Sequence, residues 1–131
     1  MNDEALQALV HYRLSRADET LQEARLMQQQ EHWNACANRL YYAAFYAVSA
    51  LLVKDGYSAS KHSGIKALFN QYYVKTGVFE KEDGRFYSYL FDLRQEGDYI
   101  DFMWLDAETV QPLPEPTIAL IEKVRAAIAG I

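Results

Sequence analysis

The 131-residue sequence contains a single cysteine, Cys36, so a disulfide bond within the chain is excluded. No histidines, cysteines and carboxylates have the spacing of a metal site, and neither a glycine-rich phosphate loop nor a nucleophile–base motif is present, so we expect no metal and no cofactor. No stretch alternates with a period of two, so we predict no β-strand. The N-terminus has no basic segment followed by an apolar one, and we therefore expect a cytoplasmic protein without a signal peptide.

Positive charge is also scarce. The 13 lysines and arginines stand against 18 aspartates and glutamates, and the net charge is −5. This balance argues against a protein that binds nucleic acid over a broad basic surface. The charge is uneven, however, because residues 54–78 hold four lysines and only one aspartate. Any polyanion should therefore approach the molecule from that side.

Apolar and aromatic residues are abundant, and they are densest in residues 38–54. From Leu40 to Val53 only Ser49 is neither apolar nor aromatic, and no residue in this run breaks a helix. A helix that is apolar on every side must be buried on every side. At about 1.5 Å per residue the run covers only ~21 Å, short of the ~30 Å hydrocarbon core of a membrane. We therefore predict the central helix of a soluble helical bundle and no membrane association.

The remaining helices are predicted from apolar residues at helical spacing and from turn residues between them. We expect an amphipathic helix over residues 3–30, a third helix whose apolar residues run from Ile65 to Tyr73, a fourth over about 85–96 and a last over about 115–129. Residues 98–105 are rich in aromatics and should pack over the bundle, and Asp106 should cap a short helical turn. The chain is thus predicted to be one all-α domain, residues 1–131, with about five helices.

The stretch best suited to carry chemistry is residues 93–99, LRQEGDY. On a helix Tyr87, Phe91, Arg94 and Asp98 share one face. One interpretation is a surface salt bridge between Arg94 and Asp98, worth only ~0.3–0.5 kcal/mol. The other is an arginine that Asp98 holds and that binds a phosphate, since guanidinium groups fit phosphate bidentately and stay charged. Spacing alone favours the salt bridge.

A second candidate lies at the head of the third helix, in residues 60–64, SKHSG. A helix N-terminus offers free amides and the positive end of the helix dipole, and Lys61 and His62 add donors, so an anion could bind there. The simpler interpretation is that Ser60 caps the helix, Lys61 is solvated and Gly64 is needed for packing. We favour the simpler interpretation from the sequence alone.

Three segments together carry a family resemblance: residues 38–46 (NRLYYAAFY), 61–64 (KHSG) and 93–99 (LRQEGDY). The chain resembles a HEPN domain (higher eukaryotes and prokaryotes nucleotide-binding), in the small stand-alone bacterial and archaeal branch with an arginine followed shortly by Asp-Tyr. The resemblance implies an antiparallel helical bundle that forms a homodimer, with the motifs of two chains facing one cleft. It also implies a ribonuclease toxin or defence effector, often with a nucleotidyltransferase as antitoxin partner.

The sequence departs from the catalytic pattern of this family at one position. Ribonuclease members carry an arginine, a polar residue, about three further residues and a histidine, whereas here Tyr99 stands where the histidine is expected. An unperturbed tyrosine, with a pKa near 10, is a poor base at neutral pH, and a histidine near 6.5 is suited to the task. Asp98 could replace it only if its pKa were raised, and a nearby Arg94 would lower that pKa. The sequence therefore leaves open whether the chain is an enzyme.

Two functional hypotheses follow. The favoured one is a homodimer that binds a nucleotide or an RNA phosphate through Arg94, Lys61 and His62, in a toxin–antitoxin or defence system with a nucleotidyltransferase partner. The alternative is a metal-independent endoribonuclease that uses Arg94 together with Asp98, Tyr99 or His62. Cleavage of RNA in the presence of a chelator distinguishes the two.

Overall fold

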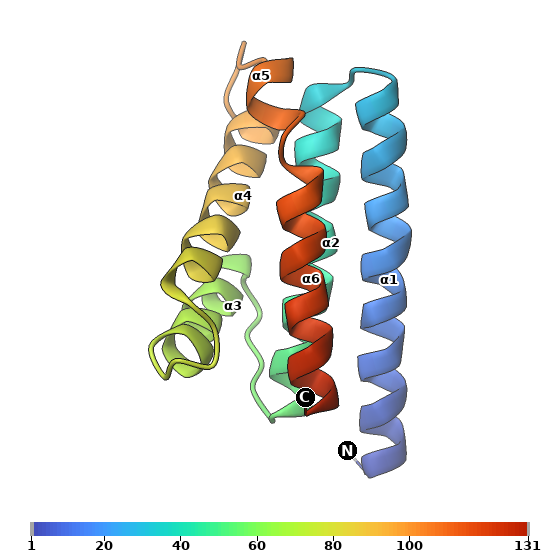
Figure 1. The fold of residues 1–131 in the computed structure, drawn as a ribbon, viewed down its shortest axis with the longest axis vertical. Helices are drawn as coiled ribbons and strands as arrows, with labels where there is room; N and C mark the ends of the chain where they lie inside the picture. The colour runs from blue at the N-terminus through green and yellow to red at the C-terminus, as the bar shows by residue number, and fades with distance from the viewer. Residues whose placement is uncertain (1, 131) are drawn as a thin grey trace.

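The computed structural model describes residues 2–130, and these residues form helices and no strand, as predicted (Figure 1). The elements are α1 (Asp3–Gln29), α2 (Trp33–Lys54), α3 (His62–Phe69), η1 (Asn70–Val74), α4 (Lys81–Tyr99), α5 (Ala107–Val110) and α6 (Pro114–Ala129). Five of them match the five predicted helices, and α5 is the predicted short turn, capped by the side chain of Asp106. The element η1 is a π-helical turn that continues α3.

The long helices run antiparallel to one another in chain order. In Figure 1, α1, α2 and α6 lie side by side along the long axis, and α4 leans against the bundle beside them. The first turn of α1 and the last turn of α6 lie at the same end of the molecule. Helix α2 contacts every other α-helix, which confirms the prediction of a central helix. None of the helices in residues 2–130 has the length and hydropathy needed to cross a membrane.

Small side chains allow α1 and α2 to pack closely. Ala17 and Ala24 of α1 have no exposed surface, and neither do Ala43, Ala47 and Ala50 of α2. Helices approach most closely where their contact residues are small. Cys36, near the start of α2, is also fully buried, as a small apolar residue would be.

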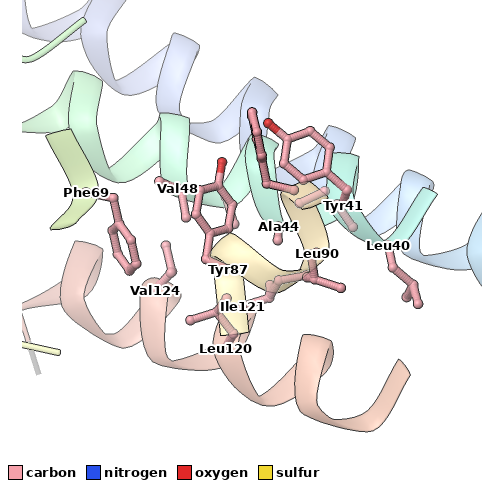
Figure 2. Close-up of a cluster of buried hydrophobic side chains, with 14 of the residues drawn as sticks. Leu40, Tyr41, Ala44, Val48, Phe69, Tyr87, Leu90, Leu120, Ile121 and Val124 are labelled. Atoms are coloured by element: carbon pink, nitrogen blue, oxygen red, sulfur yellow. The ribbon is translucent and has the colours of Figure 1, made fainter. Parts of the chain in front are cut away.

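Larger side chains fill the core where α2, α3, α4 and α6 meet (Figure 2). Figure 2 shows Tyr41 and Val48 of α2 facing Tyr87 and Leu90 of α4, with Ile121 of α6 below them in this view. All five side chains are at most 2% exposed. The core thus rests on the aromatic and branched residues that the sequence placed at helical spacing.

The prediction that α2 is buried on every side was wrong for one face. Tyr42, Phe45 and Tyr46 are only half-buried. Helix α3 begins at His62, and the imidazole of this first residue stacks on the Phe45 ring at 4.5 Å between centroids. The open face of α2 is where the candidate site lies.

The expectation that residues 98–105 pack over the bundle was also wrong, except for Leu105, which is half-buried against the core. Phe102 is 96% exposed, Trp104 81% and Tyr99 66%. The segment is instead held through its backbone by the side chain of Asn34, which leaves the aromatic side chains free to point outward. The amide of Asn34 donates to the carbonyls of Gly97 (3.1 Å) and Met103 (3.0 Å) and accepts from the backbone of Leu105 (2.8 Å).

Substituting Asn34 with alanine should therefore release this segment. Each hydrogen bond contributes about 0.5–1.5 kcal/mol, so losing three should raise the population of the open segment about tenfold or more. We expect chymotrypsin to cleave at Phe102 and Trp104 at least tenfold faster in Asn34→Ala than in the wild type. Asn38→Ala, which leaves the Asn34 bonds intact, is the matched control, and an unchanged cleavage rate in Asn34→Ala would show that something else holds the segment.

Candidate functional site

The side chain of Arg94 is buried against the open face of α2. Arg94 lies in the last part of α4 and is only 6% exposed. Its Nη1 donates to the hydroxyls of Tyr99 (3.1 Å) and Tyr42 (3.4 Å). The guanidinium carbon lies 5.0–5.9 Å from the centroids of four aromatic rings, those of Tyr41, Tyr42, Phe91 and Tyr99. Aromatic rings attract a cation by ~0.5–2 kcal/mol each, which offsets part of its desolvation.

The guanidinium of Arg94 has no acidic partner among the described residues. No aspartate or glutamate in residues 2–130 forms a salt bridge with it, and its Nε is buried without a hydrogen bond. An unpaired buried charge is costly, and that cost is relieved when an anion binds beside it. Arg94 therefore has the surroundings of an anion-binding group rather than of a structural ion pair.

The predicted contact between Arg94 and Asp98 is absent. The Oδ2 atom of Asp98 instead accepts a hydrogen bond of 2.6 Å from Nδ2 of Asn38 on α2. Helical spacing makes residues four apart neighbours, but the Arg94 side chain turns toward the aromatic rings while Asp98 stays exposed. Both interpretations that relied on this pair, a salt bridge or an arginine held by Asp98, were wrong in that respect.

A cavity open to solvent surrounds the exposed edge of the guanidinium. Its volume is about 430 Å³, and it is bordered by Tyr42, His62, Arg94, Gln95 and Tyr99. The head of α3 and the end of α4, which were predicted as two separate candidate sites, therefore meet at one cavity. Asp98 and Lys61 do not border this cavity.

His62 is held rigidly at the edge of the cavity. Its Nδ1 lies 3.1 Å from the hydroxyl of buried Tyr41, and its ring stacks on Phe45. Burial, and then the positive charge of Arg94, lower the pKa of His62 below its ordinary value of about 6.5. The imidazole is therefore neutral at neutral pH.

The head of α3 differs from the prediction in its capping. Lys61, not Ser60, is the capping residue, and no side chain makes a capping hydrogen bond. Lys61 is exposed. Gly64 is required for packing, as one interpretation held, because a Cβ atom there would lie 2.9 Å from the Cβ of Ala59.

Tyr41 and Tyr42 belong to the site but were not predicted as members of it. They belong to the central helix, where a tyrosine is most simply interpreted as a core residue. Their hydroxyls could have indicated a polar site, because a buried hydroxyl needs a polar partner and an arginine or a histidine can supply one. In the structure Tyr42 bonds to Arg94 and Tyr41 to His62.

The residues that border the cavity include one cation, Arg94, and no carboxylate. Nζ of Lys66 lies 4.3 Å from the centroid of the nearby Phe91 ring. Arg39, whose guanidinium carbon lies 5.2 Å from the centroid of Tyr42, is paired with Glu23 at 3.0 Å and adds no free charge.

These features define a helical-bundle domain with a polar cavity centred on a buried arginine. The chain belongs to the HEPN domain family, whose family model matches residues 10–126. It is 45% identical over 103 residues to a UPF0332 protein of Thermotoga maritima, covering 79% of this chain and 78% of the relative. It is 31% identical over 96 residues to a Methanocaldococcus jannaschii protein named "Putative toxin", covering 73% of this chain and 69% of that protein.

Proposed function

We propose that this HEPN-family chain is a toxin-type protein that binds a nucleotide or RNA phosphate in the cavity at Arg94. The buried guanidinium of Arg94, which has no acidic partner in residues 2–130, supports the proposal most strongly. A phosphate offers several acceptor oxygens to the exposed edge of the Arg94 guanidinium, and such charge-assisted hydrogen bonds are roughly twice as strong as neutral ones. The relative named as a toxin supports the toxin-type role.

The test is equilibrium binding of a short fluorescent single-stranded RNA, measured by anisotropy at low salt and with a chelator present. We expect saturable binding that adenosine monophosphate competes away, because both ligands present a phosphate. The affinity should fall as salt is raised, in proportion to the few phosphates contacted. Absence of binding at low salt, with folded protein, would reject the proposal.

We further propose that the chain forms a homodimer. The exposed aromatic segment, residues 99–104, begins at Tyr99, which also borders the cavity. Exposed apolar patches larger than a few hundred Å² usually mark an interface. A second copy that covers this segment would bring two cavities toward one cleft. We also propose a nucleotidyltransferase as partner protein, in keeping with the family resemblance, and co-purification of the two from one expression vector tests this.

Light scattering checks the homodimer. We expect a mass of twice the 15.1 kDa chain at micromolar concentration. Phe102→Ser combined with Trp104→Ser should shift this mass toward the monomer, because the two side chains are the most exposed aromatics described. A mass of one chain for the wild type at every concentration tested would be incompatible with a homodimer.

A second candidate function is metal-independent cleavage of RNA. It is favoured by His62, which borders the same cavity as Arg94 and is neutral at neutral pH. Among the residues considered for this role, Asp98 is engaged by Asn38, and the Tyr99 hydroxyl bonds to Arg94. Incubation of single-stranded RNA with the protein and a chelator tests for this activity.

A further inference from the structure

An imidazole and a guanidinium from different helices flank the same two tyrosine rings. The centroid of the His62 ring lies 5.8 Å from that of Tyr41 and 5.5 Å from that of Tyr42. The guanidinium carbon of Arg94 lies 5.0 and 5.6 Å from the same two centroids. A phosphodiester bound in the cavity that both residues border can therefore contact both at once.

The hydroxyl of Tyr41 fixes the orientation of this imidazole. Tyr41 has no exposed surface, and five aromatic rings surround its own, so its hydroxyl is immobile. It engages Nδ1 of His62 at 3.1 Å, while Phe45 covers one face of the imidazole. None of the described residues makes a hydrogen bond to Nε2. Nε2 is thus the ring nitrogen available to a ligand.

The charged and titratable groups around His62 favour its neutral form. Arg94 and Tyr99 face it from α4, and Tyr41 and Tyr42 from α2. Lys61, the capping residue of α3, and Lys66, within α3, are the nearest cations on its own helix. None of these groups is a carboxylate that would stabilise an imidazolium. Burial raises the pKa of Tyr41 to about 12, so its hydroxyl keeps its proton at any working pH.

The geometry points to His62, positioned by Tyr41, as the proton-transfer group of this cavity. This histidine belongs to α3, whereas the position on α4 where the family resemblance leads one to expect a histidine is occupied by Tyr99. The inference rests on the second candidate function, metal-independent cleavage of an RNA phosphodiester held by Arg94. In that step Nδ1–H of His62 donates to the hydroxyl oxygen of Tyr41, which leaves Nε2 unprotonated. Nε2 takes the proton of the ribose 2′-hydroxyl, and the 2′-oxygen bonds to phosphorus. The bond from phosphorus to the 5′-oxygen breaks, and the leaving oxygen takes a proton from water. The products are a 2′,3′-cyclic phosphate and a 5′-hydroxyl, and the imidazolium returns its proton to solvent.

His62 acts as the catalytic residue in this account, and Tyr41 as a positioning residue. A proton-transfer group contributes about 10²–10⁴-fold to rate. His62→Gln should therefore lower single-turnover cleavage of RNA at least a hundredfold in the presence of a chelator, at protein concentrations that bind all of the RNA. His11→Gln, which changes an exposed histidine of α1, is the matched control and should cleave normally.

Tyr41→Phe separates positioning from mere packing, because it removes only a hydroxyl. We expect kcat to fall about tenfold, KM to stay unchanged and the acid limb of the pH–rate profile to move, since that limb reports the His62 pKa. Circular dichroism confirms that each variant is folded. Wild-type cleavage by His62→Gln, or an acid limb that Tyr41→Phe leaves in place, would overturn the inference.

Failure of the inference can be told from failure of the binding proposal. A wild-type chain that binds RNA through Arg94 but yields no cyclic phosphate overturns the role of His62 and leaves the binding site standing. A wild-type chain that binds no RNA at all overturns both.

Discussion

Replacing Arg94 with methionine should weaken RNA binding by about ten- to a hundredfold. The substitution removes one charge-assisted contact to phosphate, worth ~1.5–3 kcal/mol, while methionine fills most of the volume that the aliphatic part of arginine occupied. Anisotropy titrations of wild type and Arg94→Met with the same RNA measure this loss. Arg94→Lys should bind with intermediate affinity, because an ammonium keeps the charge and loses the bidentate geometry.

The same substitution should change stability little. Arg94 loses two hydrogen bonds to tyrosine hydroxyls and its contacts with aromatic rings, but a buried unpaired charge is removed in exchange. We expect the free energy of unfolding to change by no more than ~1 kcal/mol. Asp98→Ala is the second control and should leave affinity unchanged, because Asp98 bonds to Asn38 and not to Arg94. Equal affinity in wild type and Arg94→Met would mean that Arg94 is structural.

The largest effect on stability is expected for Leu90→Ala. Leu90 has no exposed surface and lies in the core between α2 and α6, beside Ile121 (Figure 2). Truncating a buried leucine costs about 2–5 kcal/mol, because apolar burial is lost and a cavity remains. Chemical denaturation followed by circular dichroism measures this loss.

The matched control for Leu90→Ala is the same substitution at Leu26 of α1, which is 56% exposed. Leu26→Ala should change the free energy of unfolding by less than about 0.5 kcal/mol. If both variants lost the same stability, the core would not be where Figure 2 shows it.

The sequence predicted the helices well because their signals are local. The apolar run in residues 40–53 could only be a buried helix, and turn residues such as Gly56 and Gly77 separate the helices on either side. Gly56 and Gly77 adopt φ values of +88° and +86°, which residues with a side chain rarely adopt.

Contacts between segments that are distant in the sequence could not be predicted. Helical spacing made Arg94 and Asp98 neighbours, but it could not show that Asn38, sixty residues away, would bond to Asp98. Residues 98–105 were expected to pack because aromatic side chains avoid water. Their outward orientation depends on the hydrogen bonds of Asn34 to the backbone around them.

The candidate site was predicted in parts. Arg94, Tyr99 and His62 were each identified from motifs, but only the packing of α3 and α4 on α2 brings them to one cavity. Tyr41 and Tyr42 were missed because their hydroxyl contacts with His62 and Arg94 depend on that packing. Local pattern thus identified most of the residues, and tertiary structure alone determined which of them act together.

A crystal structure of the chain with bound adenosine monophosphate would show whether Arg94 binds phosphate. We expect phosphate oxygens at about 2.7–2.9 Å from the guanidinium nitrogens of Arg94, in the cavity bordered by Tyr42, His62 and Tyr99. A phosphate bound only by lysines of residues 54–78, with the guanidinium of Arg94 still bonded to tyrosine hydroxyls alone, would contradict this expectation.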